Sequence, residues 1–106
     1  MADITNATVE KMGENVRKAR LRQRITMNEL AETAGISRTT MINIENGHAG
    51  VSIGAWTSVL RVLGMLDSFA SSVDAKNDLV GLEMMDRDLP QRVRAPRSGR
   101  KIIRKF

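Results

Sequence analysis

The sequence contains no cysteine and only three aromatic residues, Trp56, Phe69 and Phe106. The absence of cysteine excludes disulfide scaffolds, thiolate metal sites and cysteine nucleophiles. The scarcity of aromatics means that a core has to be built from aliphatic side chains and methionine. No run approaches the ~18 consecutive apolar residues of a membrane span, and the first residues lack the basic-then-apolar order of a signal peptide. We therefore expect a cytoplasmic protein without a membrane partner.

Basic residues outnumber acidic ones, giving a net charge of +5, and they gather at the two ends of the chain. Residues 1–24 carry six basic and three acidic side chains, and residues 91–106 carry seven basic and no acidic ones. Residues 25–66 are nearly balanced, whereas residues 67–88 carry six acidic and two basic side chains. The excess of positive charge suggests a polyanionic partner.

Apolar residues recur at helical spacing, and caps and glycines divide them into short helices. Val9, Met12, Val16 and Ala19 predict a first helix that runs to about Arg24. Further helices are predicted over residues 27–34, 38–46, 53–63 and 67–73, and a sixth over the acidic residues 77–86. No segment shows the pattern of a β-strand, so we expect an all-α fold. It consists of a five-helix domain over residues 9–73, an acidic helical connector over 74–90 and a basic tail over 91–106.

Local signals mark where these helices begin and end. Thr26 and Glu29 have the spacing of a capping box, which starts a helix at Met27. The next two N-caps are Ser37 and Ser52. Gly35, Gly47 and Gly64 are expected to end helices, since glycine readily takes the left-handed conformation. The predicted core residues of these helices are Leu30, Ala31, Ala34, Ile36, Met41 and Ile44, followed by the apolar face Ile53, Trp56, Val59, Leu60 and Leu63.

The segment from Met27 to Asn46 carries the main functional signal. Two short helices joined by Gly35-Ile36-Ser37 have the sequence form of a helix-turn-helix. Ala31 has to be small because the second helix crosses the first at that point. The inward-pointing residues leave Ser37, Arg38, Thr39, Thr40 and Asn43 on the outer face and N-terminal end of the second helix. Hydrogen-bonding side chains of this size suit base edges in a major groove.

Over residues 12–66 the chain resembles the Xre or lambda-repressor-like helix-turn-helix family. The resemblance rests on the run MNELAETAGISRTTMINIENG followed by VSIGAWTSVLRVLG, with small Ala31, Gly35 and the ending Ile44–Gly47 in register. Val51 departs from the family at a position where proline is common. The resemblance implies a five-helix lambda-repressor-like domain and a sequence-specific transcriptional regulator, expected to be an autorepressor at the nucleoid.

The resemblance also implies roles for single residues. The predicted base readers are Arg38, Thr39 and Asn43, and the predicted phosphate contacts are Thr26, Met27, Ser37, Thr40 and Asn46. Helix N-termini, which favour anions, add to the phosphate contacts. Arg20 is expected to form a structural ion pair with Glu45. On the residues alone, the outer-face side chains could be merely solvated, and Thr26 and Ser37 could be merely helix caps.

We expect a homodimer on double-stranded palindromic operator DNA. One recognition helix reads only a few base pairs, and two copies spaced ~34–36 Å apart give useful specificity. The predicted dimer surface is the apolar set Leu66, Phe69, Val73, Leu79 and Leu82, which exceeds what a five-helix core needs.

The connector and tail leave several alternatives open. Leu89–Arg94 resembles the end of HipB-like antitoxins, which implies a HipA-like kinase toxin as partner. The protein could instead chiefly neutralise a toxin, or be a phage-type repressor without one. The basic tail residues are Arg92, Arg94, Arg97, Arg100, Lys101, Arg104 and Lys105. They could track phosphates, contact a partner or second protomer, or be solvated.

Catalysis is not expected. His48 is the only histidine and lies in a glycine-flanked loop, without the partners that a metal or acid–base site needs. Gly47, Gly50 and Gly54 lack the preceding strand and the following Lys-Ser/Thr of a phosphate-binding loop. We therefore predict no catalytic residue, no metal and no cofactor.

Overall fold

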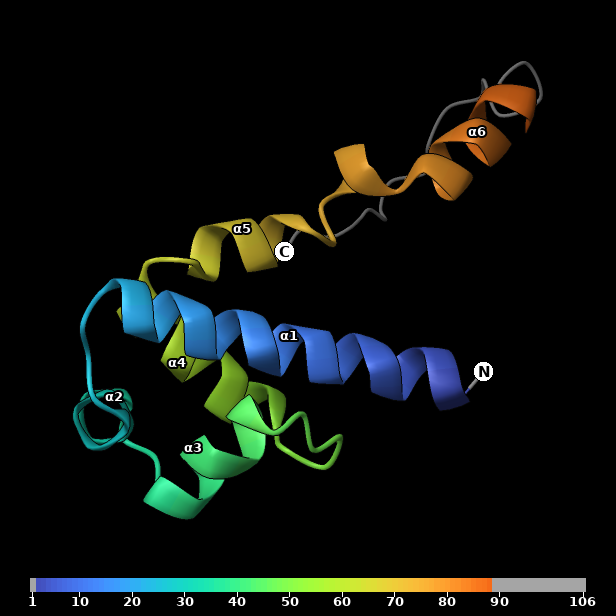
Figure 1. The fold of residues 1–106 in the computed structure, drawn as a ribbon. Helices are drawn as coiled ribbons and strands as arrows, with labels where there is room; N and C mark the ends of the chain where they lie inside the picture. Colours follow the sequence, from blue (N-terminus) through green and yellow to red (C-terminus); the bar gives the residue numbers. More distant parts are fainter. Residues whose placement is uncertain (1, 89–106) are drawn as a thin grey trace. The chain divides into compact units, whose positions relative to one another are not determined.

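A computed structural model describes residues 2–88, and these residues form helices and the turns between them (Figure 1). The all-α fold class is thereby confirmed. The helices are α1 (Ala2–Arg22), α2 (Met27–Ala34), α3 (Arg38–Glu45), α4 (Ile53–Leu63), α5 (Leu66–Ser71), a 3-10 turn (Ala75–Asn77) and α6 (Leu79–Asp88). The chain divides into two compact units between Ala70 and Ser71. The basic tail falls outside the described residues.

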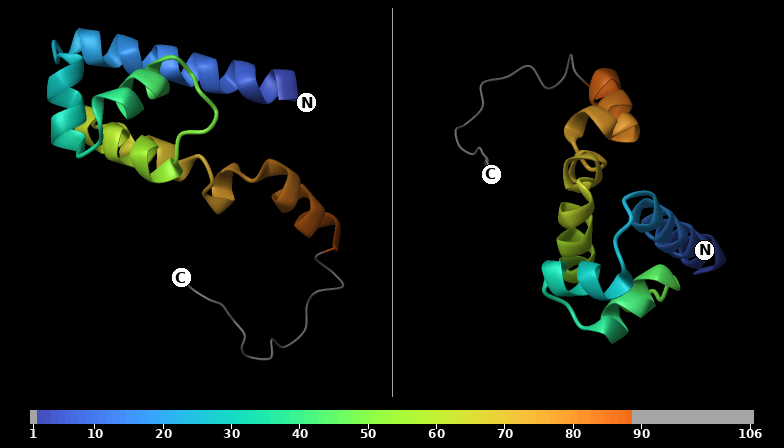
Figure 2. Two further views of the ribbon diagram at one scale, coloured as in Figure 1. Left: turned by 90° about the horizontal axis from the view of Figure 1, so that it is seen from below. Right: turned by 60° about the vertical axis from the view of Figure 1, so that its left-hand side comes forward.

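The first unit encloses a single hydrophobic core, around which α2 packs on α3 and α4 while α1 packs on α3 (Figure 2). Leu30, Met41, Ile44 and Val59 are completely enclosed. The remaining buried members are Val16, Ala19, Ala31, Ala34, Trp56, Leu60 and Leu63. Trp56 is the one aromatic residue among these eleven, in line with the aliphatic core that the composition predicts.

The prediction that Ile53 belongs to this core is wrong, since its side chain is 64% exposed. Ile53 shares a helical face with Trp56 and Leu60 by spacing, but it is the first residue of α4. Because the Cα–Cβ bonds of a helix tilt toward its N-terminus, the side chain of this first residue projects past the start of α4. Periodicity therefore identified the correct face and placed its beginning one turn too early.

The predicted helix starts at Met27, Arg38 and Ile53 are confirmed. The Thr26 hydroxyl accepts a hydrogen bond from the Glu29 amide at 3.1 Å, and the Thr26 amide donates to the Glu29 carboxylate at 2.8 Å. Ser37 and Ser52 accept from the amides three residues further on, at 3.0 and 3.1 Å. These bonds satisfy amide hydrogens that have no partner within the helix.

Four helices end on a residue in the left-handed conformation, namely Arg24 (φ 60°), Gly35 (φ 74°), Gly47 (φ 75°) and Gly64 (φ 79°). In each case the amide of the following residue donates to a carbonyl five residues earlier, at 2.8–3.1 Å. Three of these following residues, Ile25, Ile36 and Met65, also pack against the core. The fourth, His48, is exposed. The endings therefore anchor three of the four turns to the protein interior.

Arg24 is the only non-glycine residue with a positive φ in the described part of the chain. A β-carbon in this conformation costs roughly 1–2 kcal/mol. We expect Arg24→Gly to raise the free energy of unfolding by about 0.5–1 kcal/mol, measured by urea denaturation. Arg24→Ala is the control, because it removes the same charge and keeps the β-carbon. Equal stability changes in the two variants would contradict the backbone explanation.

Several helix boundaries differ from the predicted ones. α1 begins at Ala2 rather than near Val9, because a helix already nucleated by packing propagates at little cost even where it buries nothing. α3 ends one residue earlier than predicted, and α5 is shifted toward the N-terminus by one to two residues. The acidic helix begins at Leu79 because Asp78 caps it, its carboxylate accepting from the Gly81 amide at 2.8 Å.

The described residues of the second unit, 71–88, comprise the 3-10 turn and α6. The Asn77 side-chain amide donates to the Ser71 carbonyl at 2.5 Å, and the Asp74 carboxylate accepts from the Lys76 amide at 3.0 Å. None of the residues 71–87 is fully buried. Their exposed large apolar side chains are Val73, Leu79, Val80, Leu82, Met84 and Met85.

Candidate nucleic-acid interface

The inner side of α3 is fixed in the first unit. Met41 and Ile44 are completely enclosed, and the neighbouring Glu45 is 9% exposed. Ala31 on α2 is buried in the core, and α2 packs on both α3 and α4. Anchoring on one side leaves the opposite side of α3 and its N-terminal end as the part that can approach a ligand.

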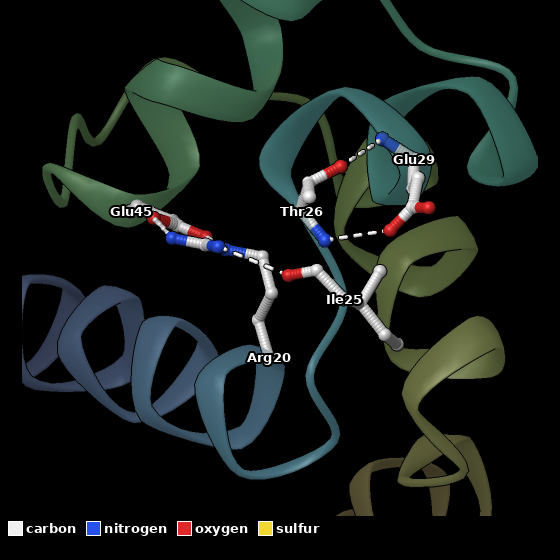
Figure 3. A network of polar contacts seen from close by, with 5 residues as sticks. All are labelled: Arg20, Ile25, Thr26, Glu29 and Glu45. Atoms are coloured by element: carbon white, nitrogen blue, oxygen red, sulfur yellow. Dashed lines mark hydrogen bonds and ion pairs between the residues drawn. The ribbon is translucent and has the colours of Figure 1, made fainter.

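Arg20 and Glu45 tie the C-terminal end of α1 to the C-terminal end of α3 (Figure 3). Arg20 Nε lies 2.6 Å from Glu45 Oε2, and Nη2 lies 3.2 Å from Oε1, so the carboxylate is held by two parallel bonds. Arg20 Nη1 also donates to the carbonyl oxygen of Ile25 at 3.1 Å. The side chains are 10% and 4% exposed. This pair fixes the axial position of α3 against α1.

Two glycines allow α1 and α3 to approach closely. A β-carbon on Gly13 would collide with the carbonyl oxygen of Ile44 and lie 2.9 Å from that of Glu45. A β-carbon on Gly47 would lie 2.5 Å from the Cα of Glu10. Sequence reasoning missed Gly13. The available signal was a glycine in the middle of a strongly periodic helix, where it costs ~1 kcal/mol relative to alanine unless packing requires it.

The predicted base readers lie on the outer side of α3. Arg38 and Thr39 are exposed, and Asn43 is half-buried. Arg38 Nη1 donates to the side-chain oxygen of Asn28, on α2, at 2.6 Å. Ser37 Oγ donates to Thr40 Oγ1 at 2.9 Å. Asn28 is a residue that the sequence did not single out, because nothing in the spacing of α2 and α3 indicated a contact between their first turns.

The predicted phosphate contacts lie at the ends of α2 and α3. Thr26 and Met27 lie at the N-terminus of α2, Ser37 and Thr40 at that of α3, and Asn46 follows the C-terminus of α3. An open hollow of about 750 Å³ runs from α3 to the N-terminus of α4. Its polar lining consists of Ser37, Thr40, Asn43, His48, Ser52 and Ser58. Sequence reasoning had assigned no ligand role to His48, Ser52 or Ser58.

Residues 2–88 contain neither a metal-binding cluster nor a membrane-spanning helix. No group of three or more histidine, aspartate or glutamate side chains is placed to hold a metal ion in this part of the chain. In the same residues, no helix combines the length and apolar character needed to cross a bilayer.

Two short helices joined by a glycine turn, the second buried on one side and polar on the other, define a helix-turn-helix domain. Residues 16–67 match the family model described as Helix-turn-helix, and this part of the chain is a helix-turn-helix domain of the Xre/Cro/C1 type. The domain indicates a DNA-binding transcriptional regulator, and families with this domain are typically non-enzymatic. The comparison with curated proteins found no match, and neither did the comparison with solved structures.

Proposed function

We propose that this protein is a sequence-specific transcriptional regulator that places α3 in the major groove of operator DNA and represses its own operon. The observation that carries the proposal is the division of α3 into a buried, ion-paired inner side and a polar outer side. The inner side holds the helix rigidly, and the outer side offers hydrogen-bonding groups to base edges. A regulator of this kind acts in the cytoplasm, at the nucleoid.

In this proposal Arg38, Thr39 and Asn43 read the bases. Arginine pairs with guanine through two parallel hydrogen bonds to O6 and N7, and asparagine pairs in the same way with adenine. The phosphate backbone is contacted by the first turns of α2 and α3, where helix amides favour anions, and by Asn46. Phosphate contacts fix the register of the protein on DNA and the base contacts supply the preference.

Arg38→Ala is expected to weaken discrimination at one base pair by about 1–3 kcal/mol. The measurement is selection of a preferred site from random DNA, followed by mobility-shift titration of that site and of its single-base-pair variants. Arg61→Ala, which removes the same charge from an exposed arginine on α4, is the control. It should affect all sequences alike, because only the phosphate-attracting charge is lost. Unchanged preference at every position in Arg38→Ala would contradict the proposed role.

The proposed homodimer rests on apolar residues that the first unit does not enclose. Val73, Leu79 and Leu82 are exposed in the second unit, while Leu66 and Phe69 in α5 are half-buried and Phe69 packs against the core. The site selection also tests the dimer. Two inverted half-sites centred ~34–36 Å apart are expected for a dimer, and a single short site would contradict it.

An antitoxin role rests on a different part of the chain. The HipB-like resemblance at Leu89–Arg94 lies outside the described residues, and the family match ends at residue 67. A HipA-like kinase as partner, and a contact made by the basic tail, therefore stay predictions from the sequence. Neither is needed for DNA binding by α3.

A further inference from the structure

We propose that Asn28 is a positioning residue for Arg38 and that it contributes to base specificity without itself reading a base. This inference rests on the proposed function, in which Arg38 contacts a base. It concerns how the arginine is held before DNA arrives.

The two residues are joined across the turn between the helices. Asn28 is the second residue of α2 and Arg38 is the first residue of α3. The 2.6 Å bond from Arg38 Nη1 to Asn28 Oδ1 links these two first turns directly. A hydrogen bond of this length from an ionised donor belongs to the stronger class of protein hydrogen bonds.

The bond determines which edge of the guanidinium remains free. The group is planar and carries five N–H donors in a fixed arrangement. With Nη1 turned toward Asn28, the edge formed by Nε and Nη2 is available for two parallel bonds to the O6 and N7 acceptors of guanine. Arg20 in this same structure uses its Nε and Nη2 edge to hold the Glu45 carboxylate while Nη1 donates to a third group, the Ile25 carbonyl.

The bond also lowers the cost of ordering Arg38 in the complex. Arginine has many side-chain rotamers, and both Arg38 and Asn28 are exposed, so packing does not restrict them. A side chain already held near its bound geometry loses less conformational freedom on binding. This gain is realised where Arg38 makes its base contact, so removal of Asn28 reduces discrimination at that base pair.

The experiment is a double-mutant cycle with Asn28→Ala, Arg38→Ala and the double variant in the full chain. The measured quantity is the Kd for the site changed at the base pair that Arg38 reads, divided by the Kd for the selected DNA site. Asn28→Ala is expected to reduce this ratio about 2–10-fold in the wild-type background. In the Arg38→Ala background the same substitution is expected to leave the ratio unchanged.

Two further variants separate positioning from a structural effect. Thr33→Ala, at another exposed polar residue of α2, should leave the ratio unaltered. Asn28→Asp keeps an oxygen acceptor for Arg38 and should retain the ratio, while its negative charge weakens binding to all DNA sequences alike. The midpoint temperature of thermal unfolding should be nearly the same for Asn28→Ala and wild type, since both partners of the bond are exposed.

The outcomes distinguish this inference from the proposed function. Loss of discrimination in Arg38→Ala together with an unaltered ratio in Asn28→Ala would overturn the positioning role and leave the DNA-reading role of α3 intact. Full additivity in the double variant would also overturn it. Failure to select any preferred site would instead overturn the proposed function, and the positioning role with it.

Discussion

Arg20→Ala is expected to lower the free energy of unfolding by about 3–5 kcal/mol, because it leaves a buried carboxylate without its counter-charge. The Glu45 side chain is 4% exposed and receives two hydrogen bonds from the guanidinium, neither of which water can replace without opening the contact between α1 and α3. The Ile25 carbonyl, at the turn after α1, would lose its bond from Nη1 as well.

Urea denaturation followed by circular dichroism measures this effect. Arg17→Ala is the matched control, since it removes an exposed arginine from the same helix and should change stability by less than about 0.5 kcal/mol. Replacing both members with apolar residues, as in Arg20→Met with Glu45→Leu, should recover much of the loss, because no unpaired charge remains buried. Equal stability of Arg20→Ala and Arg17→Ala would show that the pair is not enclosed.

Gly13→Ala is expected to lower the free energy of unfolding by about 2–3 kcal/mol, although alanine is the better helix former by about 1 kcal/mol. The added methyl group would collide with the backbone carbonyl oxygens of Ile44 and Glu45. Backbone atoms cannot rotate away as a flexible side chain does, so α1 and α3 have to separate. That separation also stretches the Arg20–Glu45 pair.

Gly54→Ala is the control for Gly13→Ala, because it adds the same methyl group to a glycine within a helix. Gly54 lies in α4, and the nearest atom to its added β-carbon is Ser52 Oγ at 3.8 Å, an ordinary contact. The helix preference of alanine should then dominate and raise stability by up to about 1 kcal/mol. If both substitutions raised the denaturation midpoint, close packing at Gly13 would be disproved.

Much of the fold could be predicted because its helix ends depend on local bonds. Thr26 and Glu29 bond to each other's backbone within four residues, and Gly35 ends α2 through bonds to carbonyls of the same helix. Such interactions join residues that are close in the sequence, so they can be predicted without knowledge of the tertiary structure. The buried faces of α2 and α3 followed from helical spacing for the same reason.

The residues that sequence reasoning missed depend on contacts between helices. Gly13 is needed because the backbone of α3 lies too close for a β-carbon, and Asn28 is identified by its hydrogen bond to Arg38. Ile53 carries the opposite error, since its spacing is that of a core residue but its side chain, on the first residue of α4, is exposed. The start of α1 was missed because residues 3–8 are exposed and so leave no hydrophobic pattern.

The two-sided construction of α3 has a consequence for how such proteins diversify. Met41, Ile44 and Glu45 hold the helix, while Arg38 and Thr39 are exposed, where substitutions usually change stability by less than about 0.5 kcal/mol. Mutations at these exposed positions therefore leave the fold largely intact, so selection for folding does not remove them. Duplicated genes that share this scaffold could acquire new target sites one substitution at a time, without passing through an unfolded intermediate.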